Sequence, residues 1–226
     1  MTPSPGPAST ILITGGNGSL GSAIAIQIAK SHYEKHHLVL TARKLDNDRT
    51  IETSAALRAL NASFEFEVLD LSSLGNVTSF AAKLRKRVQK GELPKFDGGG
   101  AVLSAAMFTY VKDSRTKDGW NEMYGINVLA QVVLRELLKD LSGALVVNIT
   151  STTHNIGSVD YFSEGKSGNG DGVVSGRVEK GAGERLGLGE AMKRYGSSKL
   201  LLVMSSYALQ RRLDAVGPSS HFHETF

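Results

Sequence analysis

Short apolar segments alternate with longer amphipathic segments along most of the chain. The short segments are rich in β-forming residues and are bounded by Gly, Asp, Asn or Ser, which is typical of strands in a covered parallel sheet. They predict strands at residues 10–14, 38–41, 64–69, 101–104 and 144–149. The longer segments carry apolar residues at helical spacing and predict helices at residues 19–33, 51–60, 74–90 and 115–141. This alternation predicts an α/β fold, in which helices flank a Rossmann-type doubly wound parallel sheet within a single domain.

One region departs from this alternation. Residues 152–194 are Gly-rich and mixed in charge, and they predict a long insert loop that is followed by a helix at residues 195–213. The Pro-rich residues 1–9 predict a flexible N-terminal arm, because they have neither the charged nor the apolar region of a signal peptide. We therefore divide the chain into this arm, a cofactor-binding domain at residues 10–214 and a short tail at residues 215–226.

Composition narrows the class of protein. The 226 residues are 41% apolar, which is enough for the core of one domain, and no apolar run is long enough to predict a membrane span. Cysteine is absent, so disulfides and thiolate metal sites are excluded and a cytoplasmic location is expected. The net charge is only +4, and the densest basic run, residues 83–90, has no interleaved aromatic residues, so we expect no nucleic-acid partner. The histidines are scattered, and no metal site is predicted.

A glycine-rich turn directly follows the first predicted strand and opens the first predicted helix. Its glycines allow close approach of the backbone to a phosphate, and the helix N-terminus adds N–H groups and a positive dipole end. The pattern predicts a dinucleotide pyrophosphate site formed by Gly15, Asn17, Gly18, Ser19, Leu20 and Gly21. The alternative is an ordinary strand–helix turn. A Walker-type phosphate loop is excluded, because no Lys-Ser/Thr pair follows the glycines.

The end of the second predicted strand indicates which cofactor is bound. NAD-selective folds place a carboxylate here to bind the adenosine ribose, whereas this chain has Ala42 followed by Arg43 and Lys44. The planar guanidinium of Arg43 suits a 2′-phosphate, with help from Lys44. We therefore predict NADP(H) as the cofactor; the alternative is that both cations are plain surface charges.

Tyr195 and Lys199 are four residues apart in the last predicted helix and therefore share one of its faces. A neighbouring ammonium group favours the phenolate and is expected to lower the pKa of the tyrosine. The pair then forms a general acid and base suited to interconverting a carbonyl and an alcohol. A Tyr-xxx-Lys spacing also arises often by chance.

Two further polar residues are candidates for the same site. Ser151 follows the last predicted strand, at the edge where ligands bind in α/β sheets, and its hydroxyl can bond a substrate oxygen. Its alternative role is to cap a turn or a helix. Asn127 lies in an apolar helix, where a buried amide is costly unless bonded. It therefore either bonds the backbone or holds a water beside Lys199.

Together these motifs resemble the short-chain dehydrogenase/reductase family over residues 10–213. Asn127, Ser151, Tyr195 and Lys199 fall in the order of its catalytic tetrad. The resemblance implies that Tyr195 donates a proton to the substrate carbonyl and that Lys199 lowers the tyrosine pKa and holds the nicotinamide ribose. It also implies that Ser151 polarises the carbonyl and that Asn127 supports a proton-relay water.

The resemblance implies further cofactor contacts and a kind of substrate. Asp70 and Leu71 follow the third predicted strand, where the family binds adenine, and Ser104 stands within the family's Asn-Asn-Ala-Gly motif. The sequence from Tyr195 onward is most similar to retinol-dehydrogenase-like and fungal biosynthetic members. Those members reduce ketones or oxidise alcohols with NADP(H), on lipophilic or secondary-metabolite substrates.

Four features depart from the family pattern. Ser19 replaces the middle glycine of the turn, and residues 103–106 read Leu-Ser-Ala-Ala. Ser151 and Tyr195 are 44 positions apart, so the insert between them is expected to border the substrate site. Only 13 residues follow Leu213, and they do not supply the last strands of the family fold.

These departures leave two functions open. The first is an NADP(H)-dependent oxidoreductase with a small-molecule carbonyl or alcohol substrate, in which a homodimer is one way to cover exposed sheet surface. The second is a catalytically silent, truncated NADP-binding module that acts as a sensor or a partner subunit. A nucleotide-sugar epimerase shares the Tyr-xxx-Lys pair, but it needs a large C-terminal substrate domain.

Overall fold

The computed structural model describes residues 6–32, 35–112, 114–138, 145–162 and 184–216. Residues 163–183 of the predicted insert, most of the predicted tail and residues 1–5 of the predicted arm lie outside this description. The same holds for the last residues of the predicted helix 115–141 and for the first residue of the predicted strand 144–149.

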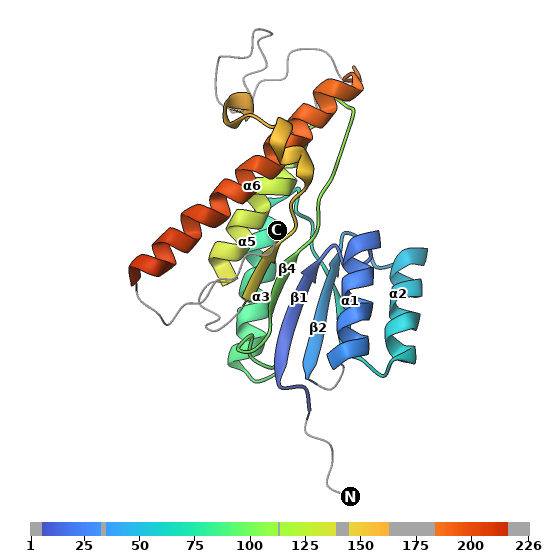
Figure 1. Ribbon diagram of the computed structural model, residues 1–226. Coiled ribbons are helices and arrows are strands. Elements are labelled where there is room, and N and C mark those ends of the chain that lie inside the picture. The colour runs from blue at the N-terminus through green and yellow to red at the C-terminus, as the bar shows by residue number, and fades with distance from the viewer. Residues whose placement is uncertain (1–5, 33–34, 113, 139–144, 163–183, 217–226) are drawn as a thin grey trace, which may run out of the picture.

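Within the described residues, five parallel strands form one sheet, as the alternating pattern predicts (Figure 1). In chain order they are β1 Ser9–Thr14, β2 His36–Ala42, β3 Ser63–Val68, β4 Gly100–Leu103 and β5 Leu145–Asn148. Their order across the sheet is β3-β2-β1-β4-β5, so the chain builds outward from β1 first in one direction and then in the other. This reversal creates a crevice at the carboxyl ends of β1 and β4, which is where ligands bind in such folds.

Helices cover both faces of the sheet, which makes the fold doubly wound as predicted (Figure 1). The longer ones are α1 Ser19–His32, α2 Asp48–Ala59, α3 Leu74–Gln89, α5 Ala130–Leu138 and α6 Leu188–Val216. On one face Ile13 of β1 belongs to a core with Leu57 of α2. On the other face Leu12 belongs to a core with Phe80 of α3 and Leu134 of α5. Because the neighbours Leu12 and Ile13 are both fully buried, β1 is covered on its two sides.

The prediction of one helix over residues 115–141 is wrong at its start. An antiparallel bridge joins Arg115 to Asn121, and Gly119 between them has a φ of 86°, which α-helical residues do not adopt. Asn121 then caps the short helix α4 Glu122–Tyr124, because its side chain accepts from the first free N–H groups. The π-helical turn η1 Gly125–Leu129 and α5 follow.

The two described ends of the predicted insert pack on neighbouring elements. The first end forms the 3₁₀ turns η2 Thr152–Ile156 and η3 Val159–Phe162, which both contact α6. At the second end, Arg185 forms an antiparallel bridge with Val111 of the segment after β4. The helix expected from residue 195 begins earlier, at Leu188.

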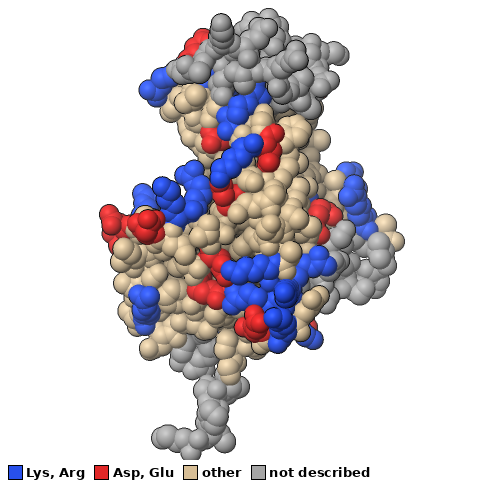
Figure 2. All heavy atoms as spheres, turned by 180° about the vertical axis from the view of Figure 1, so that it is seen from behind, with Lys and Arg blue, Asp and Glu red and all other residues tan. Residues whose placement is uncertain are grey.

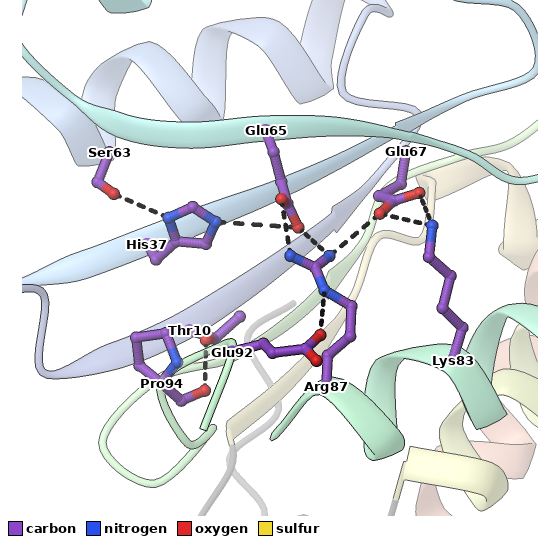
Figure 3. A network of polar contacts seen from close by, with 9 residues as sticks. All are labelled: Thr10, His37, Ser63, Glu65, Glu67, Lys83, Arg87, Glu92 and Pro94. Carbon is purple, nitrogen blue, oxygen red and sulfur yellow. Dashed lines mark hydrogen bonds and ion pairs between the residues drawn. The ribbon is translucent and has the colours of Figure 1, made fainter. Parts of the chain in front are cut away.

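The basic run at residues 83–90 lies on α3, and part of it is paired with carboxylates of β3. Lys83 contacts Glu67, and Arg87 contacts both Glu65 and Glu67 (Figure 3). Figure 2 shows Lys and Arg side chains interspersed with Asp and Glu on one face of the molecule. The run is therefore part of a mixed charge network and not a uniform basic surface.

Candidate active site

The glycine-rich turn lies at the carboxyl end of β1, and its backbone is tightly folded. Gly15 has a φ of 66°, and its carbonyl accepts from the Gly18 N–H at 2.8 Å. A Cβ on Gly21 would overlap the Gly15 carbonyl, so only glycine lets α1 begin this close to the strand. The Gly16 N–H donates to the Thr41 carbonyl at 2.8 Å, which ties the turn to the end of β2.

A pocket of about 450 Å³ opens beside this turn. It is lined by most of the residues predicted to bind the cofactor, namely Gly15, Asn17, Gly18, Ser19, Leu20, Gly21, Arg43, Asp70, Leu71 and Ser104. The structure thus brings together in one cavity residues from the ends of four strands. Lys44, Tyr195 and Lys199 do not line it.

Arg49 also lines the pocket, and sequence reasoning missed it. It lies in the first turn of α2, whose N-cap Asn47 accepts from the Thr50 N–H. Asn17 of the glycine-rich turn donates to Thr50 at 3.1 Å, so α2 begins directly beside this turn. An Asn cap a few residues beyond Arg43 is the sequence signal that could have placed Arg49 near the pocket.

Asp70 and Ser104 are fixed by hydrogen bonds at the rim of the pocket. The Asp70 carboxylate accepts from the Ser72 N–H at 2.9 Å and from Lys117 at 2.7 Å. Burial opposes ionisation of Asp70, but the bonds from Lys117 and Ser72 outweigh it and lower the pKa. Ser104 donates to the Thr14 carbonyl at 2.5 Å, which joins the ends of β4 and β1.

Tyr195 and Lys199 lie on α6, and burial dominates the titration of both. Lys199 is 2% exposed, its Nζ donates to the Ile149 carbonyl at 2.8 Å, and Nζ lies 5.6 Å from the centre of the Tyr195 ring. Burial lowers the pKa of Lys199 to about 8 and raises the pKa of Tyr195. The expected lowering of the tyrosine pKa is therefore wrong for this geometry, because desolvation of the phenolate dominates at this separation.

Ser151 follows β5 and caps the turn η2. Its side-chain oxygen accepts from the Thr153 N–H at 3.3 Å and from the Thr153 hydroxyl at 2.9 Å. This is the capping role named above as the alternative. The hydroxyl hydrogen of Ser151 remains available for a further acceptor in this arrangement.

Asn127 lies in the π-helical turn η1 and is fully buried. Its amide group exchanges two bonds with the backbone of Met107, at 2.8 Å and 2.9 Å, and donates to the Ser198 hydroxyl at 3.1 Å. The side chain therefore has the structural role that a buried amide requires. It also connects the segment after β4 to α6, one residue before Lys199.

Close backbone packing holds the turn after β5 against α6. A Cβ on Gly196 would overlap the Thr153 carbonyl, and a Cβ on Gly157 would lie 2.6 Å from the Gly196 carbonyl. Ser197 reinforces this contact, because its hydroxyl accepts from the Ser158 N–H at 2.9 Å. Gly196 thus lets the chain that carries Ser151 approach the helix that carries Tyr195.

The described residues contain neither a helix long and apolar enough to cross a membrane nor a group of acidic and histidine side chains that could hold a metal ion. The chemistry that they offer is that of a phenol, an ammonium and hydroxyl groups beside a glycine-rich pocket. A doubly wound sheet with such a turn at its reversal point defines a Rossmann-type domain.

Comparison with known sequences identifies the family. Residues 9–179 match the KR domain family, and the chain belongs to this group of short-chain dehydrogenases/reductases. Retinol dehydrogenase 13 from Mus musculus is 26% identical over 159 residues, which cover 69% of this chain and 44% of that protein. Polyprenol dehydrogenase from Homo sapiens is 25% identical over 221 residues, which cover 94% of this chain and 58% of that protein. The chain spans about half the length of these curated relatives.

Solved structures share the fold. A metagenomic short-chain oxidoreductase in complex with NADP is similar with a TM-score of 0.64 and 15% identity, over 97% of this chain and 81% of that chain. The NAD⁺-bound xylitol dehydrogenase is similar with a TM-score of 0.60 and 16% identity, over 93% of this chain and 67% of that chain. Because proteins with either cofactor share this fold, the fold alone does not distinguish NADP from NAD.

Proposed function

We propose that the chain is an NADP(H)-dependent oxidoreductase that interconverts a ketone or aldehyde and an alcohol. The observation that carries this proposal is the direct connection between the pocket and the Tyr–Lys pair. Met107 lines the pocket, and Asn127 binds both the Met107 backbone and Ser198, which lies between Tyr195 and Lys199 on α6. This connection supports a single site that includes the glycine-rich turn and the proposed acid, although Tyr195 and Lys199 do not themselves line the pocket.

The residues of the pocket fit the phosphates of NADP(H). A Cβ on Gly16 or Gly21 would overlap neighbouring atoms, so the tight turn depends on these glycines, and the backbone of such a turn at a helix N-terminus suits close approach of a pyrophosphate. Arg43 and Arg49 both line the pocket, and two guanidinium groups suit a 2′-phosphate. Asp70 would lie near the adenine. When bound, the nicotinamide supplies or accepts the hydride.

Tyr195 is the proposed proton donor. Burial raises its pKa above the usual value of 10.0, so the phenol is protonated at neutral pH and can protonate a substrate oxygen that gains negative charge. The same shift makes the phenolate scarce at neutral pH.

The neighbouring residues position the substrate and the cofactor. Ser151 has a hydroxyl hydrogen that can bond the substrate carbonyl while its oxygen caps η2. Lys199 would hold the nicotinamide ribose through its ammonium group, which is fixed by the Ile149 carbonyl. The water-holding role of Asn127 stays a prediction, since its side chain is already bonded to Met107 and Ser198.

A ketone panel with NADPH tests the proposed reaction. We expect the wild type to oxidise NADPH with at least one ketone, and Tyr195→Phe to lower kcat by on the order of a hundredfold or more, because the proton donor is lost. NADPH binding, measured by calorimetry, should stay unchanged. Tyr207→Phe makes the same change at an exposed position of α6 and should stay active. NADPH binding without oxidation of the cofactor across the panel would instead support the silent binding module.

A cofactor comparison tests the preference for NADP(H). Arg43→Ala and Arg49→Ala should each weaken NADPH binding by about tenfold and leave NADH binding nearly unchanged, because each removes a charged hydrogen bond to the 2′-phosphate. Arg211→Ala is the matched control, since Arg211 is an exposed residue of α6 that does not line the pocket. Equal affinity of the wild type for NADPH and NADH would refute the preference.

We further infer a lipophilic substrate, because the relatives include enzymes named for retinol and polyprenol. A role in secondary metabolism, a cytoplasmic location and a homodimer stay predictions from the sequence. A size measurement of the purified protein would test the homodimer.

A further inference from the structure

An aromatic side chain next to the pocket-lining Met107 contacts the ring of the proposed proton donor. Phe108 directly follows Met107, which lines the pocket, and its ring packs edge-to-face on the Tyr195 ring with centroids 5.5 Å apart and an interplanar angle of 75°. Phe108 nevertheless remains 37% exposed. Part of the Phe108 ring is therefore accessible to a ligand next to the Tyr195 ring.

The Phe108 ring is held by a second aromatic residue. Tyr110 packs on it edge-to-face with centroids 5.0 Å apart, and the guanidinium of Arg185 lies 5.6 Å from the centre of the Tyr110 ring. Phe108 therefore has edge-to-face contacts with Tyr110 and Tyr195 and keeps part of its own ring exposed. The arrangement forms an aromatic wall made of Phe108, Tyr110 and Tyr195.

Backbone pairing fixes this wall in place. The Leu186 N–H donates to the Tyr110 carbonyl at 2.7 Å, and the Lys112 N–H donates to the Glu184 carbonyl at 2.9 Å. Arg194 of α6 adds a bond to the Lys112 carbonyl at 2.6 Å. The segment after β4 is therefore anchored on both sides, and the wall is preorganised for a ligand.

We infer that Phe108 is a specificity-determining residue that selects ketones whose carbonyl is attached to a flat aromatic ring. This inference rests on the proposed function, because it assumes that the reacting carbonyl lies at Tyr195. A carbonyl bonded to Tyr195 places its substituent within reach of the neighbouring Phe108 ring. Aromatic rings attract one another through stacked or edge-to-face contacts that a saturated ring of similar size does not make.

A matched pair of ketones tests this inference. Acetophenone and cyclohexyl methyl ketone have the same carbon skeleton and differ only in the aromaticity of the ring. We expect Phe108→Leu to lower the ratio of kcat/KM for acetophenone over cyclohexyl methyl ketone by about three- to tenfold relative to the wild type, which is the range for one aromatic pair. Comparing ratios removes the difference in intrinsic reactivity between the two ketones.

Two control variants define the outcome. Phe108→Tyr keeps the ring and should retain the wild-type ratio. Phe64→Leu makes the same chemical change on β3, which β2 and β1 separate from β4, and should also retain it. An unchanged ratio in Phe108→Leu, or an equal fall in Phe64→Leu, overturns the inference.

A binding measurement separates this inference from the proposed function. Saturation-transfer NMR with the same two ketones and NADPH-loaded protein gives an aryl-over-alkyl binding ratio that needs no turnover. If neither ketone nor any other is reduced, the proposed function fails, and the binding ratio decides on Phe108 alone. Preferential acetophenone binding that is lost in Phe108→Leu supports the aromatic wall, and equal binding in both proteins refutes it.

Discussion

Two regions of the molecule treat charged side chains differently. Between β3 and α3 the folded state stabilises charged groups, whereas on α6 it destabilises the charged form of Lys199. On β3, Glu65 and Glu67 both contact Arg87 (Figure 3). His37, whose Nε2 lies 3.9 Å from the Glu65 carboxylate, and Arg87 lower the pKa of Glu65 to about 2, and Glu65 raises the pKa of Arg87. The folded state therefore favours the charged forms of Glu65 and Arg87, and this pair stabilises the folded state.

Burial of Lys199 disfavours its charged form. It bonds to a main-chain carbonyl, and burial lowers its pKa to about 8. Burial also raises the pKa of Tyr195 beside it. Groups with such perturbed pKa values gather at functional sites. The contrast fits a structural role for the charged groups at β3 and supports the catalytic role proposed for Lys199 on α6.

Lys199→Met has the largest expected effects, and we expect it to raise stability while it lowers activity. The fall of the lysine pKa from 10.5 to about 8 corresponds to a destabilisation of the folded state by about 3 kcal/mol. Replacing the lysine removes this destabilisation, but it also removes the hydrogen bond to Ile149, which stabilises the folded state by about 1 kcal/mol. We expect the variant to gain about 2 kcal/mol in unfolding free energy at pH 7 and to lose kcat by on the order of a hundredfold. Urea denaturation and NADPH oxidation measure the two effects.

The pH dependence of this gain has a defined sign. Because the pKa of Lys199 is lower in the folded state, its destabilising effect is complete below about pH 8 and disappears as the pH rises to 10.5. The advantage of Lys199→Met should therefore shrink between these values. Lys193→Met is the matched control, since Lys193 is an exposed residue of the same helix. Equal stability changes in the two variants would contradict the assigned cost.

Gly196→Ala tests the close packing that positions the site. The added Cβ would overlap the Thr153 carbonyl and push η2, with Ser151 at its start, away from α6. We expect a loss of about 1–3 kcal/mol in unfolding free energy, the usual effect of overpacking, and a fall of about tenfold in kcat. NADPH binding should stay unchanged, because neither Gly196 nor the residues of η2 line the pocket.

A second glycine of α6 supplies the control. A Cβ on Gly189 would have no atom within 4 Å, and alanine favours a helix over glycine. Gly189→Ala should therefore keep the wild-type kcat and leave stability unchanged or slightly higher. If Gly196→Ala behaves like Gly189→Ala, the contact between η2 and α6 does not position the site.

Much of the fold could be predicted from the sequence, because strand–helix alternation is a local pattern. The start of the helix predicted at residue 115 could not, because the apolar spacing there continues through a turn. Gly119 with its positive φ and Asn121 as a cap decide that α4 begins at Glu122. Gly and Asn are common turn and cap residues, but whether they end one element and begin another here depends on the bridge between Arg115 and Asn121.

Some residues of the candidate site could also be predicted from the sequence, and others could not. The residues of the glycine-rich turn, Arg43 and Asp70 follow strand ends, and the parallel sheet brings strand ends together, so they could be predicted to share a pocket. Arg49 was missed, because its position depends on where α2 begins, and the Asn47 cap is the sequence signal for that start. The direction of the Tyr195 pKa shift also needed the structure, since burial is set by tertiary packing.

Glu65→Gln has the smallest expected effect and tests the other half of the comparison. The folded pKa of Glu65 is about 2 against an ordinary value of 4.5, so its stabilising contribution is complete above about pH 4.5 and disappears as the pH falls to 2. Because the carboxylate is partly exposed and screened by solvent, we expect a loss of only about 1 kcal/mol at pH 7. Glu52→Gln, at an exposed position of α2, should change stability by less than about 0.5 kcal/mol. Urea denaturation at pH 7 and pH 3 should show the Glu65→Gln deficit shrinking at the lower pH; a deficit that is equal at both would show that charge is not its cause.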